Sequence, residues 1–438
     1  MMIRVFISLV VMHAFSLAHA LPDIQSWKTN QGLKVMYVHA PELPMIDAAL
    51  TFDAGSDRDS DLPGLSVLAH ALLNQGSEKL SADDIASKFE DVGAQFGASV
   101  NLDRSTISLR SLSKQAWFDK ALELYIQVVT KPSFPERDFE REKNRMLVGL
   151  EDKKQRPASI VSEAFYKALY QQHPYADSSS GTEESLKAIN VSDIKAFHKK
   201  YIVANNSILA IVGDIDRQQV ELIANKISSA LPMGKKLEAI PAVKPAIPKT
   251  EDIYFPSKQA HVRIGMIGIE RGNPDYFNLY VGNYILGGGG FTSRLVEEVR
   301  SKRGLSYSVY SYFIPYRKPG PFTLGLQTRS DQAKEAIEVS LNVINDFVEN
   351  GPTQEELALS KQSIANGFPL RVDSNRDTLG YLSMIGYYNL PLSYLDDFRN
   401  NIEAVSLEDV RQAFKKHVNV DDLVTIVVGS DPVSPAGE

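Results

Sequence analysis

The segment VSDIKAFHKKYIVANNSILAIVGDID, residues 191–216, recurs in degenerate form as LEDVRQAFKKHVNVDDLVTIVVGSDP, residues 407–432. Each copy joins a stretch with helical periodicity to a run of branched apolar residues that ends at a glycine, Gly213 or Gly429. Matching residues lie 216 or 217 positions apart. A repeat of this length predicts two copies of one fold, related by a pseudo-twofold axis.

The first half mixes strand and helix patterns without strict alternation. We expect strands at 33–39, 46–52, 95–101, 105–112 and 208–213, and helices at 64–73, 115–129, 136–152, 160–170 and 191–201. This order predicts an α+β fold rather than a doubly wound one. Residues 21–231 and 251–438 are then the two domains, and the proline-containing residues 232–250 form an extended linker.

Composition narrows the class of protein. The chain has 438 residues, too many for one ordinary core, with 43% hydrophobic and 23% charged residues. These values are ordinary for a globular protein and argue against a disordered or membrane protein. The formal net charge of −7 disfavours nucleic acid as a partner.

Residues 1–20, MMIRVFISLVVMHAFSLAHA, have the features of a cleaved signal peptide: one basic residue, an apolar core and a final Ala-His-Ala. A membrane anchor is the alternative, but the apolar run is shorter than the roughly 20 residues that a span requires. The chain has no cysteine, so it has neither a lipoprotein anchor nor a disulfide. Together these features predict a periplasmic protein without a membrane span.

A second segment, LGGGGFTSRLVEEVRSKRGLSYSVY at residues 286–310, packs a glycine turn, a helix and a strand into a short length. Thr292 or Ser293 is expected to cap the helix, and Gly304 to end it. Arg300 then lies near the end of the helix and Tyr307 at the head of the strand, where both can point at one site. The alternative is that Arg300 caps its helix and Tyr307 is only a packed strand residue.

The run from Arg300 to Tyr307 resembles the C-terminal signature of the insulinase (pitrilysin) family of zinc peptidases. The resemblance implies two α/β-layer halves that face each other like a clamshell. It also implies that Arg300 holds a substrate carbonyl or carboxylate and that Tyr307 stabilises the tetrahedral intermediate. The glycines that would line the substrate are Gly288, Gly289 and Gly290.

The zinc motif of that family, H-x-x-E-H, is degenerate in this sequence. In the corresponding stretch, GLSVLAHALLNQGS at residues 64–77, Val67 and Ala71 take the ligand positions and His70 takes that of the general base. The third ligand position falls at Val148 or Gly149. These side chains cannot coordinate zinc, so we expect no metal on this chain and a structural role for His70.

The substrate-gripping strand of the family is altered as well. Where the family often has Asn-Ala, this chain has Gly97-Ala98, which keeps the alanine and loses the asparagine. Ala98 is therefore the substrate-binding position that remains in the first half.

This combination matches a division of labour known in the family, as in subunits similar to those of mitochondrial processing peptidase. It predicts the zinc-free, substrate-binding subunit of a heterodimeric metalloendopeptidase that acts on peptides, whose partner carries H-x-x-E-H and the zinc. The chain alone would not be a peptidase. A non-proteolytic peptide-binding or assembly subunit is the alternative. A self-sufficient peptidase is disfavoured because the sequence has no paired histidines, no cysteine and no G-x-S-x-G elbow.

Overall fold

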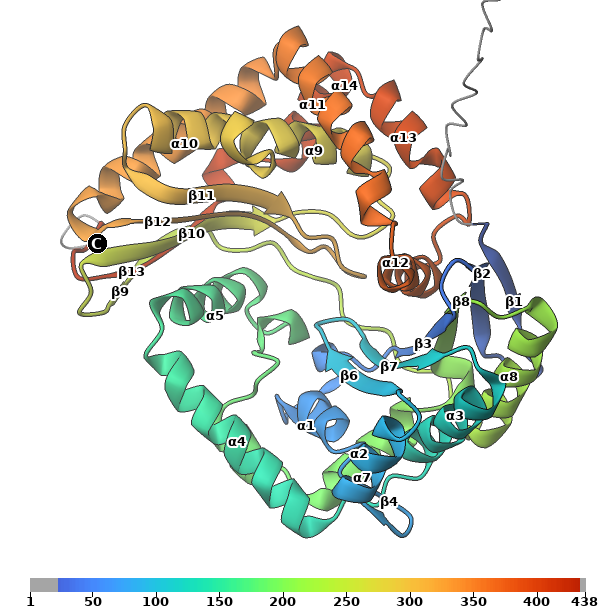
Figure 1. The fold of residues 1–438 in the computed structure, drawn as a ribbon. Coiled ribbons are helices and arrows are strands. Elements are labelled where there is room, and N and C mark those ends of the chain that lie inside the picture. Colours follow the sequence, from blue (N-terminus) through green and yellow to red (C-terminus); the bar gives the residue numbers. More distant parts are fainter. Residues whose placement is uncertain (1–22, 434–438) are drawn as a thin grey trace, which may run out of the picture.

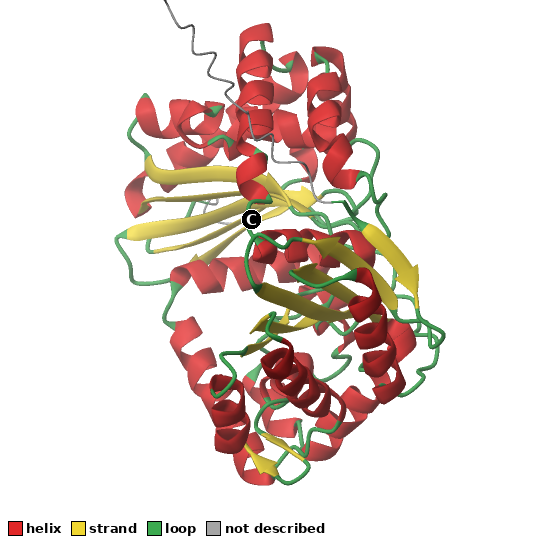
Figure 2. Cartoon of the chain, turned by 45° about the vertical axis from the view of Figure 1, so that its right-hand side comes forward, coloured by secondary structure: helices red, strands yellow, loops and turns green. Residues whose placement is uncertain are grey.

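The computed structural model describes residues 23–433, which form two sheets with helices on their outer faces (Figures 1 and 2). The sheet of the N-terminal half has the strand order β1-β2-β8-β3-β7-β6. Its strands are antiparallel except that β2 and β8 pair in parallel. The strands are β1 Gln25–Lys28, β2 Lys34–His39, β3 Met45–Phe52, β6 Gln95–Val100, β7 Ser105–Leu112 and β8 Ser207–Gly213.

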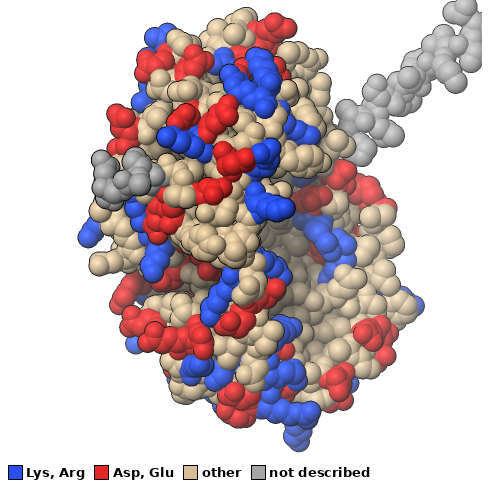
Figure 3. Space-filling view, turned by 90° about the vertical axis from the view of Figure 1, so that its left-hand side faces the viewer, with Lys and Arg blue, Asp and Glu red and all other residues tan. Residues whose placement is uncertain are grey.

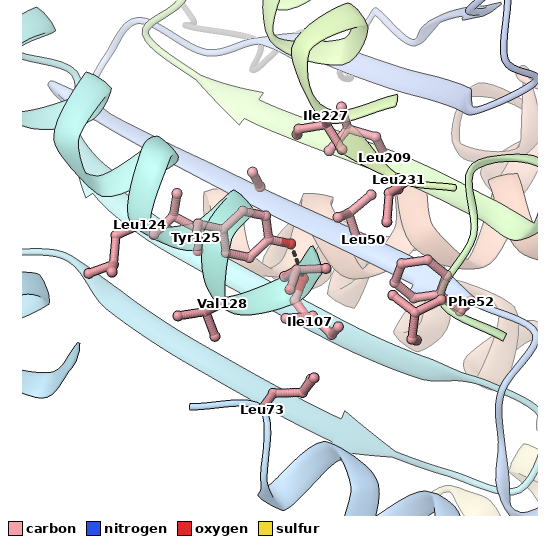
Figure 4. Close-up of a cluster of buried hydrophobic side chains, with 14 of the residues drawn as sticks. Leu50, Phe52, Leu73, Ile107, Leu124, Tyr125, Val128, Leu209, Ile227 and Leu231 are labelled. Atoms are coloured by element: carbon pink, nitrogen blue, oxygen red, sulfur yellow. Dashed lines mark hydrogen bonds between the residues drawn. The ribbon is translucent and has the colours of Figure 1, made fainter. Parts of the chain in front are cut away.

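Helices pack on the outer face of this sheet and enclose its core. Figure 4 shows part of this core, where Leu50, Ile107 and Leu209 of the sheet meet Tyr125 of α3, whose hydroxyl donates to the carbonyl of Ile107 at 2.7 Å. The helices of this half are α1 Leu65–Ala71, α2 Ala82–Glu90, α3 Gln115–Thr130, α4 Glu136–Lys154, α5 Pro157–Tyr170, α6 Glu183–Ala188, α7 Val191–Tyr201 and α8 Arg217–Ala230, with a short hairpin of β4 Gly76–Ser77 and β5 Leu80–Ser81.

The C-terminal half repeats this plan, which confirms the predicted duplication and the mixed α+β class. Its sheet has the order β11-β12-β10-β13-β9, and β9 and β13 pair in parallel. The strands are β9 Lys249–Tyr254, β10 Gln259–Ile267, β11 Ser306–Phe313, β12 Pro321–Arg329 and β13 Val424–Gly429. The helices are α9 Tyr276–Asn283, α10 Ala333–Asn350, α11 Gln354–Gly367, α12 Asn375–Tyr388, α13 Tyr394–Ala404 and α14 Leu407–His417.

Each half lends one helix to the inner face of the other half's sheet. Helix α5 packs on β10 and β13 of the C-terminal sheet, and α12 packs on β8, β3 and β2 of the N-terminal sheet. Glycines make room for both contacts. A Cβ at Gly265 would lie 2.8 Å from the ring of Phe165, and a Cβ at Gly386 would lie 2.7 Å from the side chain of Ile208. The two layers face each other as predicted, but these helices occupy much of the space between the sheets.

The hairpins that end the two sheets meet at their tips. Asp103, between β6 and β7, accepts bonds from the Tyr388 hydroxyl (2.7 Å), the Arg317 backbone N–H (2.7 Å) and the Tyr175 hydroxyl. Arg317, between β11 and β12, pairs in turn with Asp57 at 2.5 Å. Because Asp57 and Asp103 are buried and their partners come from both halves, these five residues tie the halves together. We call them the inter-half joint.

A cavity of about 590 Å³ lies beside this joint, between α5 and β10. Residues of both halves line it, among them Asn101, Ser162, Tyr166, Arg263 and Tyr316. Figure 3 shows a hollow between the upper and lower parts of the molecule on one face.

The segment between the halves contains no helix or strand from residue 231 to residue 248. It lies against the N-terminal half, where the ring of His173 contacts the Pro241 carbonyl at 3.1 Å. No helix within residues 23–433 is both long and apolar enough to cross a membrane. The predicted signal peptide lies outside the described residues.

Candidate functional site

The glycine-rich segment is built from two wide helical turns. Helix α9 runs into a π-helical turn at Tyr284–Gly288, and a second π-helical stretch, Val296–Ser301, precedes β11. Such turns are rare and often occur at functional sites. The predicted cap is wrong: the hydroxyls of Thr292 and Ser293 donate back to the carbonyls of Gly289 (3.0 Å) and Gly290 (2.7 Å). They close the glycine turn instead of capping the helix.

Close packing accounts for the first glycines of the run. A Cβ at Gly287 would lie 2.4 Å from the hydroxyl of Ser311, and one at Gly289 would lie 2.6 Å from the Tyr284 carbonyl. Buried Asn283 donates to the Ser311 carbonyl (2.8 Å) and accepts from the Ser311 hydroxyl (2.7 Å). The turn is thereby fastened to β11. Asn283 could not be predicted from the sequence, because a polar residue at the end of a largely apolar helix gives no sign of its distant partner.

The structure brings Arg300 and Tyr307 together. The guanidinium carbon of Arg300 lies 4.7 Å from the ring centroid of Tyr307 and 4.6 Å from that of Phe291. Tyr307 is 82% exposed and Phe291 73% exposed. Phe291 gave no signal in the sequence beyond its place after the glycines.

A β-bulge sets the direction of the Tyr307 side chain. The pairing of β11 with β12 slips between Ser306 and Ser308, which leaves Tyr307 as the extra residue. The Ser306 hydroxyl fixes the bulge, since it lies 2.6 Å from the Ser308 carbonyl and 2.7 Å from the Gln327 carbonyl and shares its one proton between them. Bulges commonly re-aim a side chain next to an active site.

Arg300 differs from the cations beside it. Lys302 and Arg303 both bond to Glu298, at 2.7 and 2.5 Å, and these bonds lower the pKa of that carboxyl. Arg300 has no carboxylate or hydrogen-bond partner for its guanidinium anywhere in residues 23–433. Its donors are therefore free to bind a carboxylate or carbonyl group.

Arg294 holds the segment that carries Arg300 against two helices. Its guanidinium makes a bidentate pair with Glu356 of α11, with both distances 2.7 Å, and a further bond of 3.1 Å to Asp346 of α10. Burial acts to raise the pKa of Glu356, but the bonds from Arg294 lower it overall. This pair keeps the base of the site rigid.

The degenerate zinc motif lies on α1, in the other half. His70 is buried, its Nδ1 is 2.8 Å from the Ser66 carbonyl, and its ring packs edge-on against Phe197. Burial lowers the pKa of His70 to about 4, so the ring is neutral near pH 7. This is the geometry of a structural histidine.

The positions predicted to correspond to the family's zinc ligands present no donor atoms in their side chains. Val67 and Ala71 are partly exposed, Val148 on α4 is 70% exposed, and a Cβ at Gly149 would face open space. Within residues 23–433 no group of histidines, cysteines or carboxylates could hold a metal ion.

Ala98 lies exposed on β6, the free edge of the N-terminal sheet, and α1 packs against this strand. The predicted site residues thus form two sets. Ala98 and the α1 positions belong to the lower half in Figure 1, whereas Arg300, Tyr307 and the glycine turn belong to the upper half.

Comparisons with known proteins agree with this description. Residues 34–183 match the family described as Insulinase (Peptidase family M16), and residues 188–364 match the Peptidase M16 inactive domain. A crystal structure of a peptidase M16 inactive domain from Pseudomonas fluorescens is 42% identical to this chain, with a TM-score of 0.91. The match covers 95% of this chain and 100% of that one.

Two curated relatives extend over nearly the whole chain. A Helicobacter pylori protein named non-peptidase homolog YmxG is 29% identical over 408 residues, 92% of this chain and 93% of its own length. A Bacillus subtilis protein named uncharacterized zinc protease YmxG is 25% identical over 420 residues, 94% of this chain and 99% of its own length. From the family matches, the relatives that extend over nearly the whole chain and the fold, we conclude that the chain belongs to the insulinase family of peptidases, M16.

Proposed function

We propose that this chain is the zinc-free, substrate-binding subunit of a two-chain metalloendopeptidase that acts on peptides in the periplasm. The observation that carries the proposal is the contrast between its two halves. Tyr307 is exposed and the half-buried Arg300 beside it is free of competing partners, whereas Val67, Ala71 and Gly149 stand where the zinc ligands are predicted. The partner is an insulinase-family chain that carries H-x-x-E-H and supplies the zinc and the general base.

The chemistry assigned to this chain follows from its side chains. The free guanidinium of Arg300 binds a carbonyl or carboxylate of an extended peptide, and the Tyr307 hydroxyl donates to the oxyanion that forms during attack. In the glycine turn, Gly288 to Gly290, a Cβ at Gly290 would face open space, so this end of the turn leaves room for the peptide backbone. The free edges of β6, which carries Ala98, and of β11 offer main-chain hydrogen bonds to an extended peptide.

The free edges also favour a second candidate, a subunit that binds peptides or assembles with a partner without proteolysis. The name of the H. pylori relative supports this candidate. The two candidates differ in whether the Arg300 and Tyr307 pair takes part in catalysis.

The deciding experiment measures cleavage of a mixed peptide pool by this protein alone, by an H-x-x-E-H relative from the same genome alone, and by the two together. We expect activity only in the mixture and loss of that activity with a chelator. Association of the two chains without cleavage would refute the catalytic proposal and favour the peptide-binding subunit.

In an active pair, Tyr307→Phe should lower kcat about a hundredfold, because one oxyanion donor is lost. Tyr312→Phe is the matched control, since Tyr312 is also exposed on β11 but has no contact with Arg300. Equal rates for the two variants would show that the Tyr307 hydroxyl has no catalytic role.

A further inference from the structure

We propose that Phe291 is a positioning residue, which orients the Arg300 guanidinium for in-plane recognition of a carboxylate or peptide carbonyl. The inference deepens the proposed function, because it concerns the same Arg300. It adds a residue to which neither the family motif nor any comparison assigns a role.

Packing in a hydrophobic core does not explain the position of the Phe291 side chain. Its side chain is 73% exposed and belongs to none of the hydrophobic clusters of the described chain. Gly290 precedes it with a φ of +62°, a left-handed conformation that glycine adopts without strain. The turn thus projects an apolar ring outward, at the cost of exposing it to water, and the ring contact that results is with Arg300.

The two rings are what hold the Arg300 side chain. The guanidinium carbon lies 4.6 Å from the Phe291 centroid and 4.7 Å from the Tyr307 centroid, both within the range of cation–π attraction. No ion pair or hydrogen bond fixes the guanidinium within residues 23–433. A long, rotatable side chain would sample many positions without these contacts.

This arrangement also determines which ligand fits. The N–H donors of a guanidinium lie in its plane, so rings that stack on its faces, as the carbon-to-ring distances at Arg300 allow, leave its edge open. A carboxylate matches that edge with two parallel hydrogen bonds, and a peptide carbonyl matches it with one or two. An ion pair with a neighbouring glutamate would have blocked this edge, and Glu298 is occupied by Lys302 and Arg303.

The test uses the full chain labelled with ¹⁵N-arginine, and it does not depend on any partner subunit. The Nε–Hε signal of Arg300 is identified by its loss in Arg300→Lys. We expect Phe291→Leu to move this signal toward the position of a freely exposed arginine, because the ring current of one aromatic neighbour is lost. Phe291→Tyr, which keeps the ring, should leave the signal in place.

The same signal reports binding of acetate, the simplest carboxylate probe, titrated at constant ionic strength. We expect Phe291→Leu to need about two- to fivefold more acetate for half-saturation, in line with the loss of one cation–π contact at an exposed site. Tyr254→Leu is the matched control, since Tyr254 is 75% exposed and lies on β9 at the far edge of the sheet. Both Phe291 and Tyr254 are exposed, so neither substitution disturbs the core.

An Arg300 signal or an acetate affinity that is unchanged in Phe291→Leu overturns the inference. These outcomes are independent of the mixing experiment. If the mixture of the two chains is inactive, the proposed catalytic function is refuted. The role of Phe291 is still decided separately, by the arginine spectrum and the acetate titration.

Discussion

Replacing Asp103 by alanine tests whether the inter-half joint stabilises the fold. The carboxylate is fully buried and accepts bonds from the Tyr388 hydroxyl, the Arg317 backbone N–H and the Tyr175 hydroxyl. A buried donor left without an acceptor costs about 1–3 kcal/mol. Three donors lose their acceptor in Asp103→Ala, so we expect the free energy of unfolding to fall by at least about 3 kcal/mol.

The assay is urea unfolding followed by two signals. Both tryptophans, Trp27 and Trp117, lie in the N-terminal half, so their fluorescence reports that half, whereas far-ultraviolet circular dichroism reports the whole chain. Asp61→Ala is the control, because Asp61 is exposed and should change stability by less than about 0.5 kcal/mol. A loss below about 1 kcal/mol in Asp103→Ala would refute the view that these bonds stabilise the fold.

Three further predictions concern pH, packing and metal. Burial, which outweighs the charge of Arg317, raises the pKa of Asp57 to about 8, so the folded state retains a proton that the unfolded state has lost. The contribution of the Asp57 proton to the free energy of unfolding is complete below about pH 4. It is lost as the pH rises to about 8, at up to about 1.4 kcal/mol per pH unit. Asp57→Asn should flatten this dependence of stability on pH between about pH 5 and 8, and an unchanged slope would contradict the assignment. Gly287→Ala should lower the free energy of unfolding by about 1–3 kcal/mol, because its Cβ would meet the side chain of Ser311. Gly367→Ala is the control and should not destabilise the protein, because no atom lies within 4 Å of the place of its Cβ. Equal denaturation midpoints for the two variants would count against the packing argument. After incubation with zinc and dialysis, metal analysis should find no stoichiometric zinc, and a tightly bound equivalent would reject the reading of Val67 and Ala71 as former ligand positions.

Local patterns allowed much of the fold to be predicted. Helix α3 was expected at residues 115–129 and spans Gln115–Thr130, and β7 was expected and found at Ser105–Leu112. Both elements were predicted from the periodic spacing of apolar residues, which depends only on residues close together in the sequence. Helix α8, by contrast, was not predicted as an element.

The features that could not be predicted from the sequence depend on contacts between distant residues or on unusual backbone conformations. Asp103 and Arg317 meet through the packing of two hairpins from different halves, and neither residue stands in a motif. The expected cap at Thr292 or Ser293 failed because both hydroxyls donate to carbonyls of the preceding glycine turn. Arg300 and Tyr307 were predicted because their segment resembles a family signature, whereas Phe291, on the same short segment, was not.

The exchange of α5 and α12 has a consequence for how the chain is made. Met36, Val38 and Val212 are covered by α12, a helix that leaves the ribosome long after the strands it shields. At about 5–20 residues per second, translation from the end of α8 to the start of α12 takes roughly 7–30 seconds. During this interval one apolar face of a finished sheet is bare, which is long enough for it to adhere to another nascent chain. A product that stops short of residue 375 would keep that face exposed permanently, so we expect the cell to treat truncated forms as chaperone and protease substrates rather than as stable half-molecules.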